Sequence, residues 1–233
     1  MLVIGHRGAA GLAHENTLEA LRAGLESGAD MLEFDVRMTK DGIPILAHDF
    51  HNLRTHRDFS IISRHTLAEL HHRLHEVPIV TLEEVLDEFF GTILLNIEVK
   101  GRGTGKIVTE LLKSQYIKSP SHWDNILLSS FHGYELRSIR KASKRANLAL
   151  LHFDNPFLFI AYQRSLKLSA VGFHRLYINR FALEIAKRVN LFTYAYTVDR
   201  PHAAVLLAQQ GVDGVVTNRP DKIIAELKQF SIR

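Results

Sequence analysis

Short apolar runs alternate with amphipathic segments along the whole of the 233-residue chain. The runs are rich in Val, Ile, Leu and Phe and have the length of strands, whereas the segments between them repeat apolar residues at helical spacing. Eight strands are predicted: Leu2–Gly5, Met31–Val36, Ile93–Val99, Asn125–Ser129, Asn147–His152, Ala170–Phe173, Leu191–Thr197 and Gly214–Thr217. Helices are predicted near residues 16–27, 81–90, 104–116, 133–145, 156–166, 180–189, 201–210 and 220–230.

Eight strand–helix pairs in a chain of this length predict an α/β fold, a TIM (β/α)8 barrel. A doubly wound open sheet is the structural alternative, because it also alternates strands and helices. No linker or low-complexity tract divides the chain, so residues 1–233 are expected to form a single barrel domain. More than 40 residues separate the second strand from the helix at 81. We therefore expect a small insertion after the second strand, at about residues 49–79, with short helices of its own.

The predicted strand at 31–36 places carboxylates among apolar residues. Because strand side chains alternate between two faces, one face carries Glu33 and Asp35 and the other is apolar. The predicted strand at 93–99 alternates in the same way, with Glu98 on its polar face. An antiparallel strand with one solvated face shows the same alternation, so exposed carboxylates are the simpler alternative.

Active sites of TIM barrels lie at the C-terminal ends of the strands and in the loops that follow them. Carboxylates that point inward there need a counter-charge, either a divalent cation or the side chains of Arg7, Arg37 and Lys100. Carboxylate ligation favours a hard ion such as Mg²⁺, Ca²⁺ or Mn²⁺ over Zn²⁺. The polar or aromatic residues at predicted strand ends and loops are His6, Arg7, Glu33, Asp35, His48, Asp49, Glu98, Lys100, Ser130, Phe131, His132, Thr197 and Asp199.

The tetrapeptide GHRG at residues 5–8 combines two chemically useful side chains with flanking glycines. Glycine lets the backbone turn sharply and approach a ligand closely. The guanidinium of Arg7 suits a phosphate, and the imidazole of His6 suits acid–base chemistry near neutral pH. Two histidines beside a metal, an arginine and a lysine are typical of a phosphoryl-transfer site.

Composition narrows the possible classes of protein. A net charge of +4 and a pI near 9.3 favour anionic ligands only weakly. Nucleic-acid binding is not expected, because the sequence has no basic groove motif that is rich in aromatic residues. The chain has no cysteine, which excludes disulfides and thiolate ligands. The start MLVIGHRG lacks the features of a signal peptide, and no apolar run reaches the roughly 18 residues of a membrane span. We expect a cytoplasmic protein without stable membrane insertion; the oligomeric state is not fixed by sequence.

A set of motifs in a fixed order resembles the glycerophosphodiester phosphodiesterase family. The motifs cover the chain from the first strand to the last helix. They are GHRG and ENT (5–8 and 15–17), EFDV (33–36), DGIPILAHD (41–49), NIEVK (96–100), SSF (129–131), YTVD (196–199) and GVDGVVTNRP (211–220). The resemblance implies a TIM barrel that hydrolyses small-molecule glycerophosphodiesters to sn-glycerol 3-phosphate and an alcohol, with one divalent cation, Mg²⁺ or Ca²⁺.

The same resemblance implies roles for individual residues. Three carboxylates match the metal ligands of the family, two histidines match its catalytic acid and base, and two cations match its phosphate contacts. In the family, attack by the glycerol 2-hydroxyl gives a cyclic phosphate that water then opens. The resemblance suggests the first histidine as base and the second as acid in the first step, an order that the sequence does not assign. The positions are Glu33, Asp35 and Glu98 for the metal, His6 and His48 for catalysis, and Arg7 and Lys100 for the phosphate, with Phe131 as a candidate wall of the glycerol pocket.

Several positions depart from the common family pattern. His14 replaces a proline, the segment Leu53–Arg57 differs throughout, and Asp199 replaces an asparagine. The extra negative charge of Asp199 is expected near the mouth of the site, where it would affect the choice of alcohol. Asn218 is expected mainly to precede a helix.

Three other functions compete with the leading one. A phospholipase-type phosphodiesterase would act on a lipid headgroup, and an apolar rim near residues 50–65 would support it, but HNLRTHRDFSIIS is mostly polar. A non-catalytic ligand-binding barrel predicts the loss of a site histidine or carboxylate, and none is lost. A metal-dependent sugar isomerase gives no reason for GHRG. Neither the identity of the metal nor the alcohol is fixed by sequence.

Overall fold

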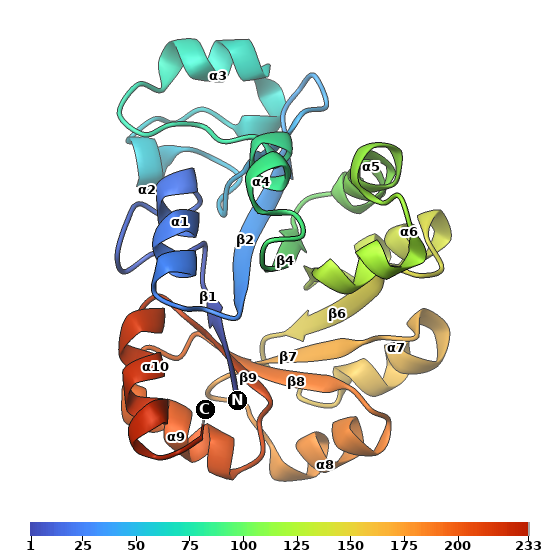
Figure 1. Ribbon diagram of the computed structural model, residues 1–233. Coiled ribbons are helices and arrows are strands. Elements are labelled where there is room, and N and C mark those ends of the chain that lie inside the picture. The colour runs from blue at the N-terminus through green and yellow to red at the C-terminus, as the bar shows by residue number, and fades with distance from the viewer. Residues whose placement is uncertain (233) are drawn as a thin grey trace.

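The strands form a closed barrel surrounded by helices (Figure 1). The computed structural model describes residues 1–232. Parallel strands follow the order β1-β9-β8-β7-β6-β5-β4-β2, and pairing of β1 with β2 closes the barrel. The strands are β1 (Leu2–Gly5), β2 (Met31–Met38), β4 (Leu94–Val99), β5 (Ile126–Ser130), β6 (Asn147–His152), β7 (Ala170–His174), β8 (Phe192–Tyr196) and β9 (Gly214–Thr217), with β3 (Pro44–Leu46) antiparallel to β2. The predicted TIM barrel is confirmed, and the open doubly wound sheet is wrong.

The two faces of β2 have different surroundings. Leu32, Phe34 and Val36 point outward into the large core between the sheet and the helices. Met31 points inward, where it joins a smaller apolar cluster that fills the barrel. Because β2 pairs in parallel with β1 and β4, both faces are buried, and the alternative of an antiparallel strand with exposed carboxylates is wrong.

The helices cover the outside of the barrel, and their ends agree with the sequence signals. Thr81 forms a capping box with Glu84, and Pro201 and Pro220 open their helices. The predicted helix at 104–116 is α-helical to Leu111 and continues as a π-helical turn. The helices are α1 (Leu18–Glu26), α4 (Leu82–Phe89), α5 (Thr104–Leu111), α6 (Gly133–Ala142), α7 (Leu158–Leu166), α8 (Arg180–Arg188), α9 (Pro201–Gln209) and α10 (Pro220–Gln229).

The insertion after β2 is a small layer of its own at the top of Figure 1. It contains α2 (Leu53–His56), a 3₁₀ turn at Ile62–Arg64 and α3 (Leu67–Arg73). A separate apolar cluster holds it to the strand β3 and consists of Ile45, Ile62, Leu70, Leu74 and Ile79. The short β3 was not predicted, because three residues are too few for a period-2 signal.

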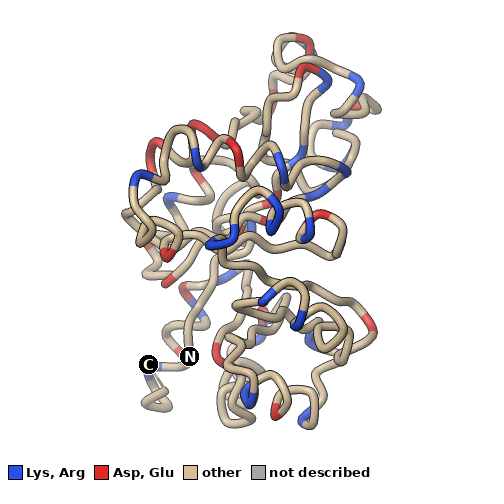
Figure 2. Tube along the Cα trace, turned by 90° about the vertical axis from the view of Figure 1, so that its right-hand side faces the viewer, with Lys and Arg blue, Asp and Glu red and all other residues tan. Residues whose placement is uncertain are grey.

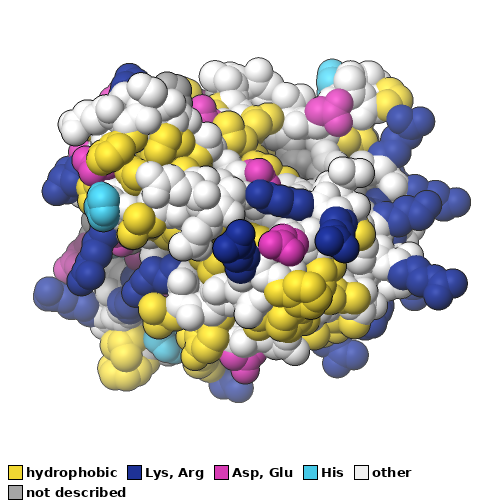
Figure 3. Space-filling model, turned by 90° about the horizontal axis from the view of Figure 1, so that it is seen from below, with side chains coloured by type: hydrophobic (Ala, Val, Ile, Leu, Met, Phe, Trp, Pro, Cys, Tyr) yellow, Lys and Arg dark blue, Asp and Glu magenta, His cyan; other side chains and the backbone are white. Residues whose placement is uncertain are grey.

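The surface mixes charged and apolar side chains. Lys and Arg are distributed over the whole trace rather than along one groove (Figure 2). The face below α8 and α9 in Figure 1 shows hydrophobic side chains between basic ones (Figure 3). Over residues 1–232, no helix has both the length and the apolar character to cross a membrane. The two termini lie side by side, where the Met1 amino group contacts the carbonyl of Ile232 at 3.3 Å (Figures 1 and 2).

Candidate active site

Three carboxylates meet inside the C-terminal end of the barrel. Asp35 on β2 is the direct neighbour of Glu98 on β4, and Glu33 is the neighbour of Asn96. One oxygen from each of Glu33, Asp35 and Glu98 lies within 4.8 Å of the others. The three residues are at most 9% exposed. The alternation of polar and apolar residues suggested that these carboxylates share a face, and the register of the two parallel strands brings them together.

The acidic cluster is only partly neutralised by the protein. Burial and the charge of Asp35 raise the pKa of Glu33 to about 8, and burial and Asp35 raise that of Glu98 to about 7. Burial would also raise the pKa of Asp35, but Lys100 and Arg7 outweigh it and hold that pKa well below its usual range. Glu33 Oε1 is buried without a hydrogen-bond partner. An unpartnered buried carboxylate oxygen in an all-oxygen set fits a hard divalent cation.

The GHRG segment turns sharply at the end of β1. Arg7 and Gly8 have positive φ, 51° and 86°, and a Cβ on Gly8 would lie 2.4 Å from the backbone of Ala20. The amide of Arg7 donates to Glu33 Oε2 at 2.8 Å, which holds the turn over the acidic cluster. Positive φ is uncommon for a residue such as arginine. The local conformation directs Arg7 into the site and explains why glycine follows it.

Two cations contact the cluster. Arg7 Nε lies 3.3 Å from Asp35 Oδ2, and its Nη1 donates to Glu15 Oε1 at 2.7 Å. Lys100 Nζ lies 3.2 Å from Asp35 Oδ1 and 2.5 Å from Glu98 Oε1. Asp35 is thus flanked by both cations, whereas Glu33 has neither within ion-pair distance. Both carboxylate oxygens of Asp35 are therefore occupied by cations of the protein.

Aromatic side chains form another part of this site. The ring of Phe131 has Lys100 Nζ 5.7 Å from its centroid and packs edge-on against Tyr196, with the centroids 5.8 Å apart. The Tyr196 hydroxyl donates to the carbonyl of His152 at 2.7 Å, which fixes the orientation of that ring. A cavity beneath is lined by His6, Glu33, Asn96, Glu98, Leu151, Tyr194, Tyr196 and Val216.

His6 is held by a chain of hydrogen bonds that the sequence did not reveal. Its Nδ1 lies 2.7 Å from Asn218 Oδ1, and Asn218 Nδ2 donates to Asp199 Oδ2 at 2.8 Å. Because the amide oxygen accepts, Nδ1 carries the proton and Nε2 is left with its lone pair. Burial and Arg7 lower the pKa of His6, and the hydrogen bond that its Nδ1 donates to Asn218 opposes this effect. Asp199 therefore lies behind His6, and Asn218 does more than precede a helix.

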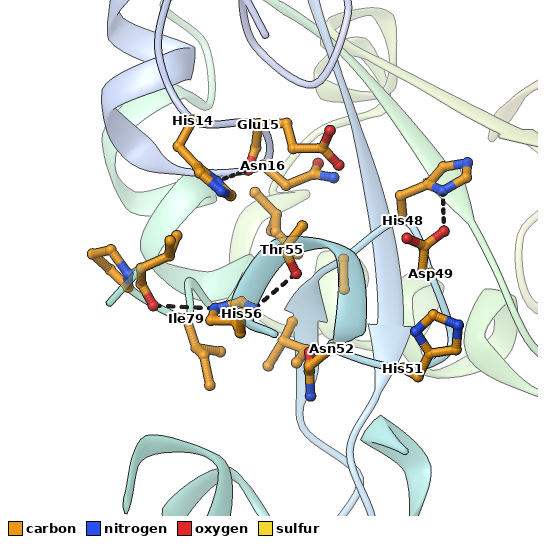
Figure 4. A pocket seen from close by; sticks show the side chains of 15 residues that line it. His14, Glu15, Asn16, His48, Asp49, His51, Asn52, Thr55, His56 and Ile79 are labelled. Carbon is orange, nitrogen blue, oxygen red and sulfur yellow. Dashed lines mark hydrogen bonds and ion pairs between the residues drawn. The ribbon is translucent and has the colours of Figure 1, made fainter. Parts of the chain in front are cut away.

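His48 has a different support. Its Nδ1 lies 2.7 Å from Asp49 Oδ1, as Figure 4 shows. Asp49 Oδ2 accepts from Arg54 Nε at 2.7 Å, and Arg54 also donates two hydrogen bonds to Glu15. Burial, with Lys100 and Arg7, lowers the pKa of His48, while the charge of Asp35 and the hydrogen bond to Asp49 oppose that effect. The segment at 53–57, which departs from the family pattern, thus supplies the arginine that ties the insertion to the barrel through Glu15.

Neighbouring polar residues mainly support these groups. Asn16, with φ of 57°, donates from Nδ2 to Asp35 Oδ2 at 3.0 Å. The other histidines beside the hollow in Figure 4 make local contacts: His14 contacts the carbonyl of Glu15, and His56 contacts Thr55 and the carbonyl of Val77. All eight residues proposed from sequence lie at this end of the barrel. The positioning residues Asp49, Arg54, Asp199 and Asn218 were not identified as such.

Comparison with known proteins agrees with this geometry. A family model described as the glycerophosphoryl diester phosphodiesterase family matches residues 6–222. A glycerophosphodiester phosphodiesterase from Caldanaerobacter subterraneus is 30% identical, over 96% of both chains. The structure of an Oleispira antarctica phosphodiesterase in complex with sn-glycerol-3-phosphate superposes with a TM-score of 0.85, at 26% identity over 98% of this chain and 97% of that one. The Thermotoga maritima glycerophosphodiester phosphodiesterase has a TM-score of 0.83 at 25% identity, over 97% of both chains.

Proposed function

The chain belongs to the glycerophosphodiester phosphodiesterase family of phosphoric diester hydrolases, and from this premise we propose that it releases sn-glycerol 3-phosphate by metal-assisted acid–base catalysis. The observation that carries the mechanism is the unequal support of the two histidines. His6 is backed by a neutral amide, whereas His48 is backed by a carboxylate. The substrate class is supported by the product named in the Oleispira complex.

Glu33, Asp35 and Glu98 are proposed to hold one divalent cation, Mg²⁺ or Ca²⁺. The unpartnered Oε1 of Glu33 and the spacing of the three carboxylates support this assignment. A cation bound there would stabilise negative charge on the substrate oxygens. The choice between the two metals depends on ligand number and cavity size, which three carboxylates leave open.

Arg7, Lys100 and Phe131 are proposed to position the substrate. Arg7 and Lys100 flank the cluster and would contact the phosphate oxygens, where their charges also stabilise the transition state. Phe131 lies beside Lys100 and would pack against the carbon atoms of glycerol. The three side chains would therefore orient the diester with the phosphorus atom near His6 and the carboxylates that would hold the metal.

His6 is proposed as the base of the first step and His48 as the acid. His6 Nε2 removes the proton of the glycerol 2-hydroxyl, whose oxygen attacks phosphorus. The bond from phosphorus to the alcohol oxygen breaks, and His48 protonates that oxygen. A carboxylate partner such as Asp49 favours the protonated form of an imidazole, so we assign to His48 the proton that is donated to the alcohol. In the second step the roles reverse: His48 accepts a proton from water, which opens the cyclic phosphate, and His6 returns a proton to the 2-oxygen.

A second candidate function is supported by exposed apolar residues of the insertion. Phe50, Leu53 and Phe59 are 58%, 39% and 81% exposed, although the surrounding sequence is polar. These side chains would contact acyl chains if the diester were part of a lipid. Lysophosphatidylcholine is therefore included as a substrate in the experiment below.

The experiment measures sn-glycerol 3-phosphate released from glycerophosphocholine and glycerophosphoethanolamine. Parallel reactions contain EDTA, added Mg²⁺ or added Ca²⁺, and compare wild type with His6→Ala and with His72→Ala, an exposed histidine outside the site. We expect metal-dependent release that falls at least about 100-fold in His6→Ala and is unchanged in His72→Ala. Metal-loaded, folded protein that releases nothing from either diester would refute the proposal. Turnover of lysophosphatidylcholine alone, followed as released choline because its other product keeps the acyl chain, would favour the second candidate.

A further inference from the structure

A basic hollow adjoins the site on the side of His48. It lies between the end of β2, the 3₁₀ turn of the insertion and the loop from β4 to α5. Its volume is about 290 Å³, near the lower end of small-molecule sites. Its lining contains three cations and no carboxylate: Arg37, Met38, Phe50, Ile62, Ser63, Lys100, Gly101, Arg102 and Thr104.

The hollow is connected to the reaction centre at two points. Lys100 belongs to its lining and also contacts Asp35 and Glu98. Arg37 Nε donates to the carbonyl of His48 at 2.8 Å, so this guanidinium lies directly beside the proposed acid. Because the alcohol leaves from the oxygen that His48 protonates, its remaining atoms extend toward this side of the site.

Two of the cations have hydrogen-bond donors without a partner in the described part of the protein. Within residues 1–232, Arg37 Nη1 and Nη2 and the whole guanidinium of Arg102 make no hydrogen bond or ion pair. The positive charge of the hollow is therefore not fully compensated by the protein.

The loop that carries Arg102 is held in one conformation. Gly101 and Gly103 on either side of it have φ of 86° and 87°. The amide of Gly103 donates to Glu135 Oε1 at 2.7 Å, and Thr104 Oγ1 donates to the carbonyl of Lys100 at 2.7 Å. A fixed loop places an exposed arginine at the edge of the hollow before any ligand arrives.

We propose that this hollow is the subsite for the leaving alcohol and that it selects glycerophosphodiesters whose alcohol carries a second anionic group, a phosphate or a carboxylate. The proposal rests on the proposed function, because it uses the position of the alcohol during turnover. Arg37 and Arg102 supply the donors for the anion, in addition to Lys100. A quaternary ammonium group such as choline is repelled by the guanidinium groups of Arg37 and Arg102, whereas Lys100 is already paired with Asp35 and Glu98.

The test uses a matched pair of substrates, glycerophosphoglycerol and the same diester with a terminal phosphate, together with glycerophosphocholine. Values of kcat/KM are compared for wild type, Arg102→Ala, Arg102→Glu and the control Lys106→Ala, which changes an exposed lysine outside the hollow. We expect wild type to prefer the terminal phosphate about tenfold or more and glycerophosphocholine to be the poorest substrate. Arg102→Ala reduces that preference about fivefold, mainly through KM, and Arg102→Glu reduces it further, whereas Lys106→Ala leaves it unchanged.

Equal kcat/KM for the matched pair, or a preference that Arg102→Glu does not alter, overturns the proposal. Calorimetric titration in EDTA, where metal-dependent turnover stops, tests the subsite separately from catalysis. Tighter binding of the terminal-phosphate diester that is weakened in Arg102→Ala supports the subsite even if no substrate is hydrolysed, in which case only the proposed function fails. Equal binding of both diesters by wild type refutes the subsite.

Discussion

The metal-free protein should lose stability as the pH rises, because Glu33 is buried beside Asp35. Its pKa is raised from 4.5 to about 8 in the folded state, first by burial and then by Asp35. The folded state therefore retains a proton that the unfolded chain gives up near pH 4.5. The contribution of Glu33 to the free energy of unfolding is fully present below that pH and is lost progressively as the pH rises toward about 8.

The magnitude follows from the two pKa values. Between about pH 5.5 and pH 8.5, the contribution of Glu33 to the free energy of unfolding falls by about 3 kcal/mol. For a domain of this size, that corresponds to a decrease in Tm of about 6–12 °C. Glu33→Gln has no proton to lose and nearly the same shape, so it should remove most of this pH dependence.

The assay is urea unfolding in EDTA at the two pH values for wild type, Glu33→Gln and Glu76→Gln, an exposed control. Wild type and the control should become less stable at the higher pH by about 3 kcal/mol more than Glu33→Gln. Added Mg²⁺ or Ca²⁺ should restore the wild type at the higher pH and have a smaller effect on Glu33→Gln. Parallel pH dependence in all three proteins would refute the assignment of a destabilising charge to Glu33.

Three further predictions concern the supporting residues. Asn218→Asp places a carboxylate beside His6 and should move the acidic limb of the kcat/KM profile to higher pH by about one unit; an unmoved limb contradicts the role of His6 as base. Asp49→Asn keeps a hydrogen-bond partner for His48 but removes its charge, and steady-state kinetics should show kcat reduced about 100-fold, whereas a normal kcat would exclude His48 as acid. The carboxylate oxygens of Glu135 accept hydrogen bonds from the amides of Gly103 and Gly105, and Glu135→Gln removes one of these two acceptors. The free energy of unfolding, measured in urea, should be about 1–3 kcal/mol lower than that of Glu76→Gln. Equal stability of the two variants would contradict this role of Glu135.

The barrel was predictable from sequence because its signals are local. Apolar runs, helical periodicity and the Thr81 capping box all act within a few residues, and each predicted strand and helix is present with small changes at its ends. The acidic cluster was partly predictable, since alternation put Glu33 and Asp35 on one face. Their contact with Glu98 depends on strand register, which the alternation does not specify.

The supporting hydrogen bonds were not predictable in the same way. Asn218 is 212 residues from His6, and nothing near either residue indicates their contact. The influence of Asp199 on the alcohol stays a prediction, but its hydrogen bonds with the side chain and the amide of Asn218 were not predicted. Such contacts arise from closure of the barrel, when the first and last strands become neighbours.

The carboxylate of Glu15 is shared between two structural units: Arg7 belongs to the barrel and Arg54 to the insertion. For protein engineering, this makes the insertion a segment that could be replaced, with a defined ionic contact to the barrel. A chimera that receives a foreign insertion would keep the contacts of Glu15 with both units only if the graft supplies a cation in place of Arg54. Substrate range could then be changed by exchanging one segment, provided that the design keeps an ion pair between the new insertion and Glu15.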